Sequence, residues 1–158
     1  MKIDLREPGP ELCGEIAGYR REMLEAGSSM DGCGDLSRME DPAVWLAQVE
    51  SLRREETCPA PWGPATQFVA LSETGQLLGM IQVRRRFNDY LERYGGHIGY
   101  SVRPSQRRRG VAKEMLRQAL GFCKEIGLTR VLITCLEDNE ASRRTILANG
   151  GVYESTGV

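Results

Sequence analysis

The sequence lacks the features that mark membrane, secreted and metal-cage proteins. No apolar run approaches the ~20 residues that cross a bilayer. The first residues, Met-Lys-Ile-Asp-Leu-Arg-Glu, contain no apolar stretch of the kind found in secretory signals. The five cysteines form no CxxC pair, and there is one histidine. We therefore expect reduced thiols, no metal, no membrane partner and a cytoplasmic location.

A large net charge is missing as well. The 21 basic and 22 acidic side chains leave a formal charge of −1. A dedicated nucleic-acid binder would be strongly basic, so we expect no nucleic-acid partner. The composition, 41% apolar and 27% charged, is typical of globular proteins, and no repeat or shift in composition divides the chain. Residues 1–158 are expected to form a single domain.

Apolar periodicity and turn residues outline the secondary structure. Strands are predicted at 2–7, 66–71, 76–84, 97–102, 131–136 and 152–156. Helices are predicted from Leu12 to the glycine at 27, from Asp41 and Pro42 onward, at 111–123 and at 139–149. Residues 72–75 are predicted to form a hairpin turn. Residues 28–41 are rich in glycine, serine and acidic side chains, which predicts a loop.

The most informative segment joins the strand at 97–102 to the helix that begins at Val111. It reads Arg-Pro-Ser-Gln-Arg-Arg-Arg-Gly-Val-Ala. The first N–H groups of a helix have no intrahelical partners and lie at the positive end of its dipole, so they bind anions. Gly110 allows a phosphate to approach the backbone, and Ala112 is too small to block it. Positive charge is added by Arg107, Arg108, Arg109 and Lys113.

This turn differs from two common nucleotide-binding loops. It has neither the GxxxxGK[ST] pattern of a P-loop nor the GxGxxG pattern of a dinucleotide fold. Taken alone, it is also compatible with a solvated arginine run at the start of an ordinary helix. The preceding strand and the amphipathic pattern of the following helix favour a pyrophosphate site instead.

Residues 107–112, Arg-Arg-Arg-Gly-Val-Ala, resemble the (Gln/Arg)-x-x-Gly-x-(Gly/Ala) signature of the GNAT acyltransferase superfamily. Residues 138–142, with the glycines at 150 and 151, resemble the family's Asn-x-x-(Ala/Ser) helix. The resemblance covers roughly residues 2–157 and implies an α/β fold of the α+β type. This fold is a mixed, mostly antiparallel sheet flanked by about four helices. The strands at 97–102 and 131–136 would diverge, and the family's final strand would be absent.

The resemblance implies acetyl-CoA as the acyl donor. Its pantetheine arm would lie between the diverging strands, where backbone groups of residues 100–102 bond to it and to the thioester carbonyl. Asn139 and Ser142 would lie near the pantetheine or the departing sulfur, although Asn139 is also a favoured helix N-cap. The implied cofactor-binding residues are Tyr100, Ser101, Val102, Arg107, Arg108, Arg109, Gly110, Val111, Ala112, Lys113, Asn139 and Ser142.

The proton-transfer residues do not follow the family pattern. Many members carry a tyrosine in the last helix that protonates the leaving thiolate, and here that position is Ile146. Tyr153, Cys135 and water are the alternatives. His97 and Glu137 are the candidate general bases. The ordinary pKa of histidine suits this task, but a strand-end histidine bonded to the backbone is the other interpretation of His97. Three positions separate it from Tyr100, so the two side chains are expected on opposite faces of the strand.

The acceptor side is predicted from charge and from the resemblance. The loop at 28–41 lies where the family binds its acceptor, and its Asp31, Asp35, Glu40 and Asp41 would attract a cationic amine. A solvated loop is the other interpretation. The arginines at 84–86 form either a solvated strand end or a contact to an anion. The chain ends directly after the strand predicted at 152–156, so we expect an open sheet edge that favours a homodimer or lowers stability.

Together these features predict an N-acetyltransferase that moves an acetyl group from acetyl-CoA to a primary amine by direct attack. The acceptor is expected to be a small molecule or a peptide. The alternative is a non-catalytic sensor module that binds acyl-CoA, because the usual tyrosine is missing. A binder of nucleic acid built on the arginines at 84–86 and 107–109 is disfavoured by the net charge.

Overall fold

The structure is a computed structural model, and it describes residues 2–54, 57, 64–85, 97–128, 130–134 and 139–152. Several predictions from the sequence lie outside the described residues. They are the roles of Glu137, Tyr153 and Cys135 and nearly all of the strand at 152–156.

A four-stranded antiparallel sheet forms the centre of the protein. Its strands are β1 (Asp4–Arg6), β2 (Ala65–Leu71), β3 (Leu77–Arg84) and β4 (Ile98–Val102), and they lie side by side in that order. The predicted hairpin turn joins β2 to β3, with a hydrogen bond from the Ser72 N–H to the Gln76 carbonyl (2.9 Å). The first strand is shorter than predicted, since only residues 4–6 pair with β2.

Four α-helices surround the sheet in the part of the chain that the structure describes, at the positions that the sequence predicts. They are α1 (Cys13–Glu25), α2 (Pro42–Arg53), α3 (Val111–Glu125) and α4 (Glu140–Ala148). Asp41 caps α2 as expected, because its carboxylate accepts a hydrogen bond from the Ala43 N–H at 2.9 Å. Gly127, with a φ of +88°, follows the end of α3. No helix in the described part of the chain is long and apolar enough to cross a membrane.

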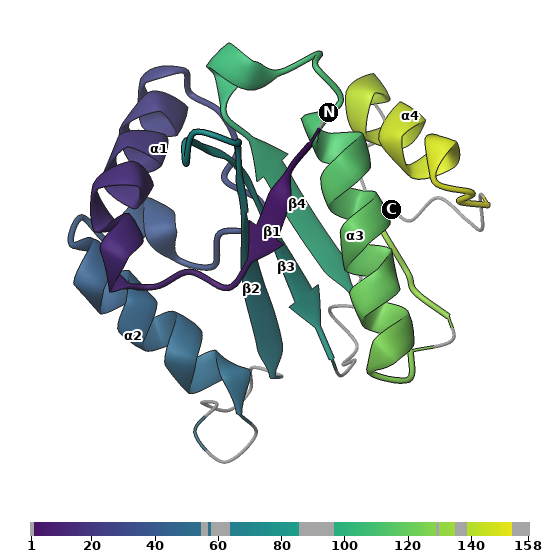
Figure 1. Cartoon of the computed structure of the whole chain (residues 1–158), viewed down its shortest axis with the longest axis horizontal. Helices are drawn as coiled ribbons and strands as arrows, with labels where there is room; N and C mark the ends of the chain where they lie inside the picture. Colours follow the sequence, from purple (N-terminus) through teal and green to yellow (C-terminus); the bar gives the residue numbers. More distant parts are fainter. Residues whose placement is uncertain are drawn as a thin grey trace.

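The helices cover both faces of the sheet, with α1 and α2 on one side and α3 and α4 on the other (Figure 1). On the first side, strand residues Val69, Leu71, Leu77 and Met80 pack with Ile16, Tyr19, Met23, Leu36 and Trp45. On the second side, strand residues Phe68, Ala70, Leu78, Ile81, Val83, Ile98 and Val102 pack with Val111, Met115, Leu116, Ala119 and Cys123. Burial on both faces explains why β2 and β3 read as nearly continuous apolar runs rather than as alternating ones.

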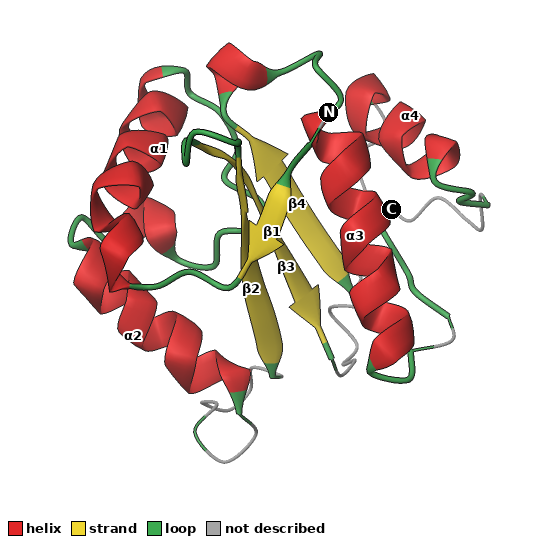
Figure 2. Ribbon diagram, viewed as in Figure 1, coloured by secondary structure: helices red, strands yellow, loops and turns green. Residues whose placement is uncertain are grey.

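Of the strand predicted at 131–136, the described residues 131–134 form a single isolated bridge beside β4 rather than a regular strand. Within the described residues 130–134, Ile133 forms a parallel bridge with Ile98, and the His97 N–H donates to the Leu132 carbonyl at 2.7 Å. These contacts lie near the first residue of β4. At its other end, β4 leads through a short 3₁₀ helix (Pro104–Gln106) into the turn that precedes α3 (Figure 2).

Candidate functional site

The turn between β4 and α3 leaves the first amides of α3 exposed to a ligand. Gly110 precedes the helix with a left-handed φ of +83°, and the first intrahelical bond runs from the Glu114 N–H to the Gly110 carbonyl (3.1 Å). The N–H groups of residues 111–113 come before this bond and therefore point out of the helix end. A Cβ at Gly110 would meet no atom within 4 Å other than those of its chain neighbours, so the space beside Gly110 is open.

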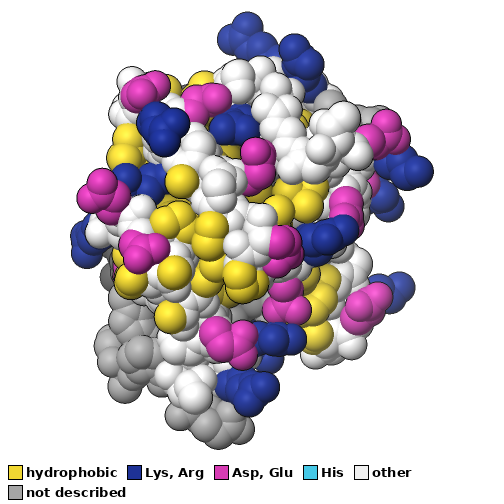
Figure 3. Space-filling view, turned by 60° about the vertical axis from the view of Figure 1, so that its left-hand side comes forward, with side chains coloured by type: hydrophobic (Ala, Val, Ile, Leu, Met, Phe, Trp, Pro, Cys, Tyr) yellow, Lys and Arg dark blue, Asp and Glu magenta, His cyan; other side chains and the backbone are white. Residues whose placement is uncertain are grey.

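A second left-handed residue curls the same turn. Arg108 has a φ of +64° and is the only non-glycine residue with positive φ among the residues described. Such curled backbone turns the N–H groups inward to form an anion-binding concavity. The side chains of Arg108, Arg109 and Lys113 are exposed. Basic side chains project from the upper edge of the protein in Figure 3, the edge at which Figure 1 shows this turn.

Arg107 differs from its neighbours, which the sequence pattern did not predict. Its Nε donates to the Val102 carbonyl at 3.0 Å, and a terminal guanidinium nitrogen donates to the Ser28 hydroxyl just beyond α1. Arg107 is nevertheless exposed, as Arg108 and Arg109 are, and its guanidinium joins the turn to β4 and to the chain just beyond α1.

The 3₁₀ helix before the turn is joined to α1 through Glu22. The Glu22 carboxylate accepts hydrogen bonds from the Ser105 N–H (2.9 Å) and hydroxyl (3.0 Å), and it lies 3.4 Å from the Arg103 guanidinium. Burial works to raise the pKa of Glu22. The bonds from Ser105 and the charges of Arg103 and Arg107 outweigh this effect and lower the pKa below its ordinary value. Glu22 is therefore a carboxylate near neutral pH.

The register of β4 determines which of its backbone groups face a ligand. The Arg84 N–H donates to the His97 carbonyl (2.7 Å), and the Arg103 N–H donates to the Leu78 carbonyl (3.0 Å), so odd-numbered residues of β4 bond to β3. The backbone groups of Tyr100 and Val102 consequently point away from β3, toward the side on which Ile133 pairs. Ser101 was predicted with them, but its backbone faces Met80 of β3.

The Ser101 side chain also faces the protein interior. Its hydroxyl lies 2.7 Å from the Tyr19 hydroxyl and 3.4 Å from the Cys33 thiol, and all three side chains are buried. Burial raises the pKa of the Cys33 thiol to about 12 and the pKa of Tyr19 well above its usual range. Cys33 is therefore a neutral thiol with a structural role rather than a nucleophile. Ser101 joins β4 to α1 and to the loop at 28–41.

The structure brings Tyr100, Asn139 and Ser142 together. Asn139 caps α4, because its side-chain oxygen accepts the Ser142 N–H at 3.1 Å. The Ser142 hydroxyl lies 2.5 Å from the Tyr100 hydroxyl, which links β4 to the first turn of α4. The N-cap interpretation of Asn139 is therefore observed. Ile146, at the position of the family tyrosine, packs against the apolar core shared with α3.

His97 bonds to the backbone of the neighbouring segment. Its Nδ1 accepts a hydrogen bond from the Leu132 N–H at 2.9 Å. Burial, together with the nearby Arg84 charge, lowers the pKa of the imidazole below its ordinary value. The ring is therefore neutral at pH 7, with Nδ1 committed as an acceptor. This is the strand-end arrangement that the sequence left as the other interpretation of His97.

The loop at 28–41 is held closely against the sheet. Gly32, with a φ of +74°, lies on β4 so tightly that a Cβ there would come within 2.4 Å of the Gly99 carbonyl oxygen. Gln67 of β2 donates to the Gly32 carbonyl, and the Trp45 indole of α2 donates to the Cys33 carbonyl, both at 2.7 Å. The centre of this loop is therefore buried, which the sequence did not predict.

The four acidic residues of this loop differ in their surroundings. The Asp35 carboxylate accepts a hydrogen bond from Gln48 at 2.8 Å, and Asp41 caps α2. Asp31 and Glu40 are exposed. Asp31 directly precedes Gly32 and thus lies beside the part of β4 that contains Tyr100. Of the four, Asp31 and Glu40 are the better candidates to meet a cation.

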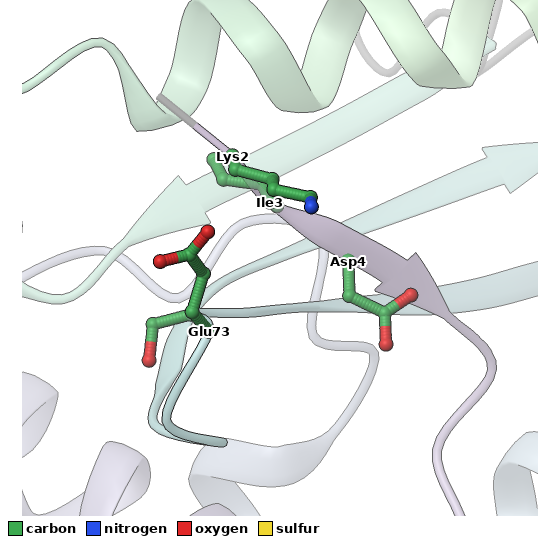
Figure 4. Close-up of a pocket in the computed structure, with 5 residues that line it drawn as sticks. Lys2, Ile3, Asp4 and Glu73 are labelled. Atoms are coloured by element: carbon green, nitrogen blue, oxygen red, sulfur yellow. The ribbon is translucent and has the colours of Figure 1, made fainter.

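An open surface hollow lies beside β1 and the hairpin turn, lined by Lys2, Ile3, Asp4, Ser72 and Glu73 (Figure 4). Its charged side chains are of both signs and point in different directions. None of its lining residues belongs to the turn before α3, so we assign it no function. In the part of the chain that the structure describes, no group of three or more His, Cys, Asp or Glu side chains is placed to hold a metal ion.

These features define a class of protein: an α/β domain in which a helix N-terminus with an open anion site lies at the end of a strand with outward-facing amides. Comparison with known families identifies it further. The model of the acetyltransferase (GNAT) family matches residues 35–150, well over half of the chain. The chain therefore belongs to this family, as its sequence signature predicts, and is an acetyl-CoA-dependent acyltransferase.

Solved structures share the fold at low sequence identity. A ribosomal-protein-S5-alanine acetyltransferase from Vibrio fischeri has a TM-score of 0.72 at 17% identity, with 98% of this chain and 82% of that chain covered. AAC(6')-Iy, solved with the bisubstrate analog CoA-S-monomethyl-acetylneamine, has a TM-score of 0.64 at 18% identity, with 100% and 96% covered. The microcin C7 self-immunity acetyltransferase MccE, solved with acetyl-CoA and AMP, has a TM-score of 0.62 at 15% identity, with 94% and 78% covered. No curated protein sequence matches the chain significantly.

Proposed function

We propose that this protein transfers the acetyl group of acetyl-CoA to a primary amine by direct attack, and that residues 1–158 form one acyltransferase domain. The observation that carries the proposal is the turn before α3, where the space beside Gly110 is open, the first helix amides are free, and Arg108 and Arg109 project outward. The CoA pyrophosphate is the anion that this arrangement fits. A homodimer stays a prediction from the sequence.

The reactive end of acetyl-CoA is proposed to lie along the outward edge of β4. The backbone groups of Tyr100 and Val102 face this edge, and the Val102 carbonyl is already bonded by Arg107. An N–H group on this edge would stabilise the oxyanion that forms when the amine attacks the thioester carbonyl, an effect worth about 3 kcal/mol in acyl transfer. Collapse of the intermediate breaks the carbon–sulfur bond and leaves the acetyl group on nitrogen.

Two protons must move in this reaction. The attacking amine loses one, and the departing thiolate gains one. His97 is proposed as a base. Its neutral ring accepts the Leu132 N–H at Nδ1, so the ring proton lies on Nε2, and His97 takes a proton only at Nδ1 after this hydrogen bond breaks. Glu137 is the second candidate base, and Tyr153 is the candidate acid. Substituting each separately, and measuring kcat against pH, tests these roles.

The acceptor is proposed to bind between the loop at 28–41 and β4, with Asp31 or Glu40 facing its ammonium group. Their exposure beside a loop that packs on β4 supports this position. One of the similar structures is named for an alanine of ribosomal protein S5, and another was solved with the bisubstrate analog CoA-S-monomethyl-acetylneamine. We infer from this range that the acceptor is either a peptide amine or a small polyamine-like molecule.

Thiol release from acetyl-CoA in the presence of amines tests the proposal directly. We expect turnover with at least one peptide N-terminus, aminoglycoside, amino acid or polyamine. Saturable CoA binding without turnover for every amine in the panel would instead favour the alternative, a sensor module that binds acyl-CoA. Ile146, at the position of the family tyrosine, is the observation that favours this alternative.

A further inference from the structure

One face of α1 carries the residues that contact β4 and the turn. Tyr19, Glu22 and Met23 recur at the spacing that places side chains on one side of a helix. Tyr19 contacts Ser101 at 2.7 Å, Glu22 contacts Arg103 and Ser105, and the Met23 sulfur lies 4.0 Å from an Arg107 nitrogen. This face of α1 therefore follows the chain from the end of β4 to the start of the turn.

Arg103 adds a buried positive charge to the contact between α1 and the end of β4. The Arg103 residue is only 8% exposed, its Nη1 donates to the Leu77 carbonyl at 2.9 Å, and its guanidinium carbon lies 5.9 Å from the centre of the Tyr19 ring. A buried guanidinium needs an opposite charge, because a buried charge without a partner is strongly destabilising. Its Nε lies 3.4 Å from Glu22, which supplies that charge.

Ser105 shows why this carboxylate affects the turn itself. Both donors of Ser105, the backbone N–H and the hydroxyl, bond to the two oxygens of Glu22. Ser105 lies in the 3₁₀ helix that leads directly into residues 107–110. Its N–H is held by a side chain from another element, so the path of the backbone into the left-handed residues Arg108 and Gly110 depends on where Glu22 holds it.

We propose that Glu22 is a positioning residue for the pyrophosphate turn. It holds Ser105 and Arg103 so that the amides at the start of α3 and the side chains of Arg108 and Arg109 converge on one anion. Glu22 does not touch the ligand. This inference rests on the proposed function, because it assumes that the turn binds the pyrophosphate of CoA.

The experiment compares three ligands by isothermal titration calorimetry: CoA, ADP, which keeps the pyrophosphate, and pantetheine, which lacks it. Glu22→Gln keeps the size of the side chain and removes its charge. We expect the affinities for CoA and for ADP both to fall roughly tenfold, because the charge that strengthens the hydrogen bonds from Ser105 and forms the ion pair with Arg103 is lost. The affinity for pantetheine should stay that of the wild type. Glu25→Gln, an exposed carboxylate on the same helix, is the matched control and should bind all three ligands normally.

Two results would overturn the inference. One is unchanged CoA affinity in a folded Glu22→Gln protein. The other is an equal loss of affinity for pantetheine and ADP, which would indicate a general loss of structure. If Glu22→Gln does not fold, Ser105→Ala removes one of the two bonds and should give the same pattern with a loss of about threefold. Failure of the proposed function is distinguishable: without a pyrophosphate site the wild-type protein would bind neither CoA nor ADP, and a protein that binds CoA but releases no thiol with any amine would still give the result expected for Glu22→Gln.

Discussion

Gly32 of the loop at 28–41 lies directly on the backbone of Gly99 in β4. A Cβ at Gly32 would come within 2.4 Å of the Gly99 carbonyl oxygen and 2.7 Å of the Tyr100 Cα. Two glycines, one on each surface, allow this approach, because any side chain at the crossing would separate the loop from the strand. The contact places the proposed acceptor loop against the strand that is proposed to hold the thioester.

Gly32→Ala is expected to destabilise the protein through this contact. Gly27→Ala provides a matched control, because Gly27 has a similar φ of +62° but no atom within 4 Å of its missing Cβ, whereas Gly32 has a φ of +74°. Left-handed strain alone costs about 1–2 kcal/mol, and the backbone clash should bring the Gly32→Ala loss to roughly 3 kcal/mol or more. Urea unfolding measures both variants. Equal losses would show that the loop moves away at no cost.

Gly110→Leu is expected to abolish CoA binding while leaving the protein folded. Its side chain would occupy the open space beside Gly110 that we assign to the pyrophosphate. Gly127→Leu, at the other end of α3, is the control, since Gly127 has a φ of +88° and the same open surroundings. Both variants should lose about 1–2 kcal/mol of stability. Calorimetric titration with CoA should separate them, and unchanged CoA affinity in Gly110→Leu would contradict the pyrophosphate assignment.

The pKa of His97 predicts a loss of stability in acid. Burial and the Arg84 charge lower this pKa in the folded protein below the ordinary value of 6.5. Between these two values the unfolded chain binds a proton that the native protein does not, so the free energy of unfolding falls as the pH drops below about 6.5. His97→Asn removes the titration but keeps an oxygen that can accept the Leu132 N–H.

The measurement is the difference in the free energy of unfolding between the wild type and His97→Asn. As the pH is lowered from about 7.5 to about 5, the free energy of unfolding of the wild type should fall relative to that of His97→Asn. A difference that is constant with pH would show that the native and unfolded pKa values of His97 are equal.

Cys33 is expected to resist thiol reagents in the native protein. Its thiol is fully buried and its pKa is raised to about 12, so almost no thiolate forms at neutral pH. Cys13, which is partly exposed, serves as the internal reference. Alkylation with iodoacetamide followed by peptide mass spectrometry should modify Cys13 first. Modification of Cys33 at the same rate would mean that the loop at 28–41 opens readily.

Much of the fold follows from local patterns in the sequence. The four helices and the hairpin of β2 and β3 appear at the predicted positions, because apolar periodicity, Asp41, Gly75 and Gly127 are signals carried within each element. β1 is shorter than predicted because alternation over residues 2–7 does not determine how many of them pair. Burial of β2 and β3 on both faces also depends on helices that lie far from them in the chain.

Some features of the candidate site also follow from local sequence patterns, whereas others depend on how the elements pack. The sequence by itself predicts the donor side, because strand, glycine and helix N-terminus are contiguous and residues 107–112 resemble the family signature. Only the tertiary structure decided that Arg107 bonds to the Val102 carbonyl, that the Ser101 hydroxyl faces Tyr19, and that Glu22 holds Ser105. Tyr19 and Ser101 are 82 positions apart, and Glu22 and Ser105 are 83 positions apart. Contacts over such distances depend on how the elements pack, and no local pattern records that packing.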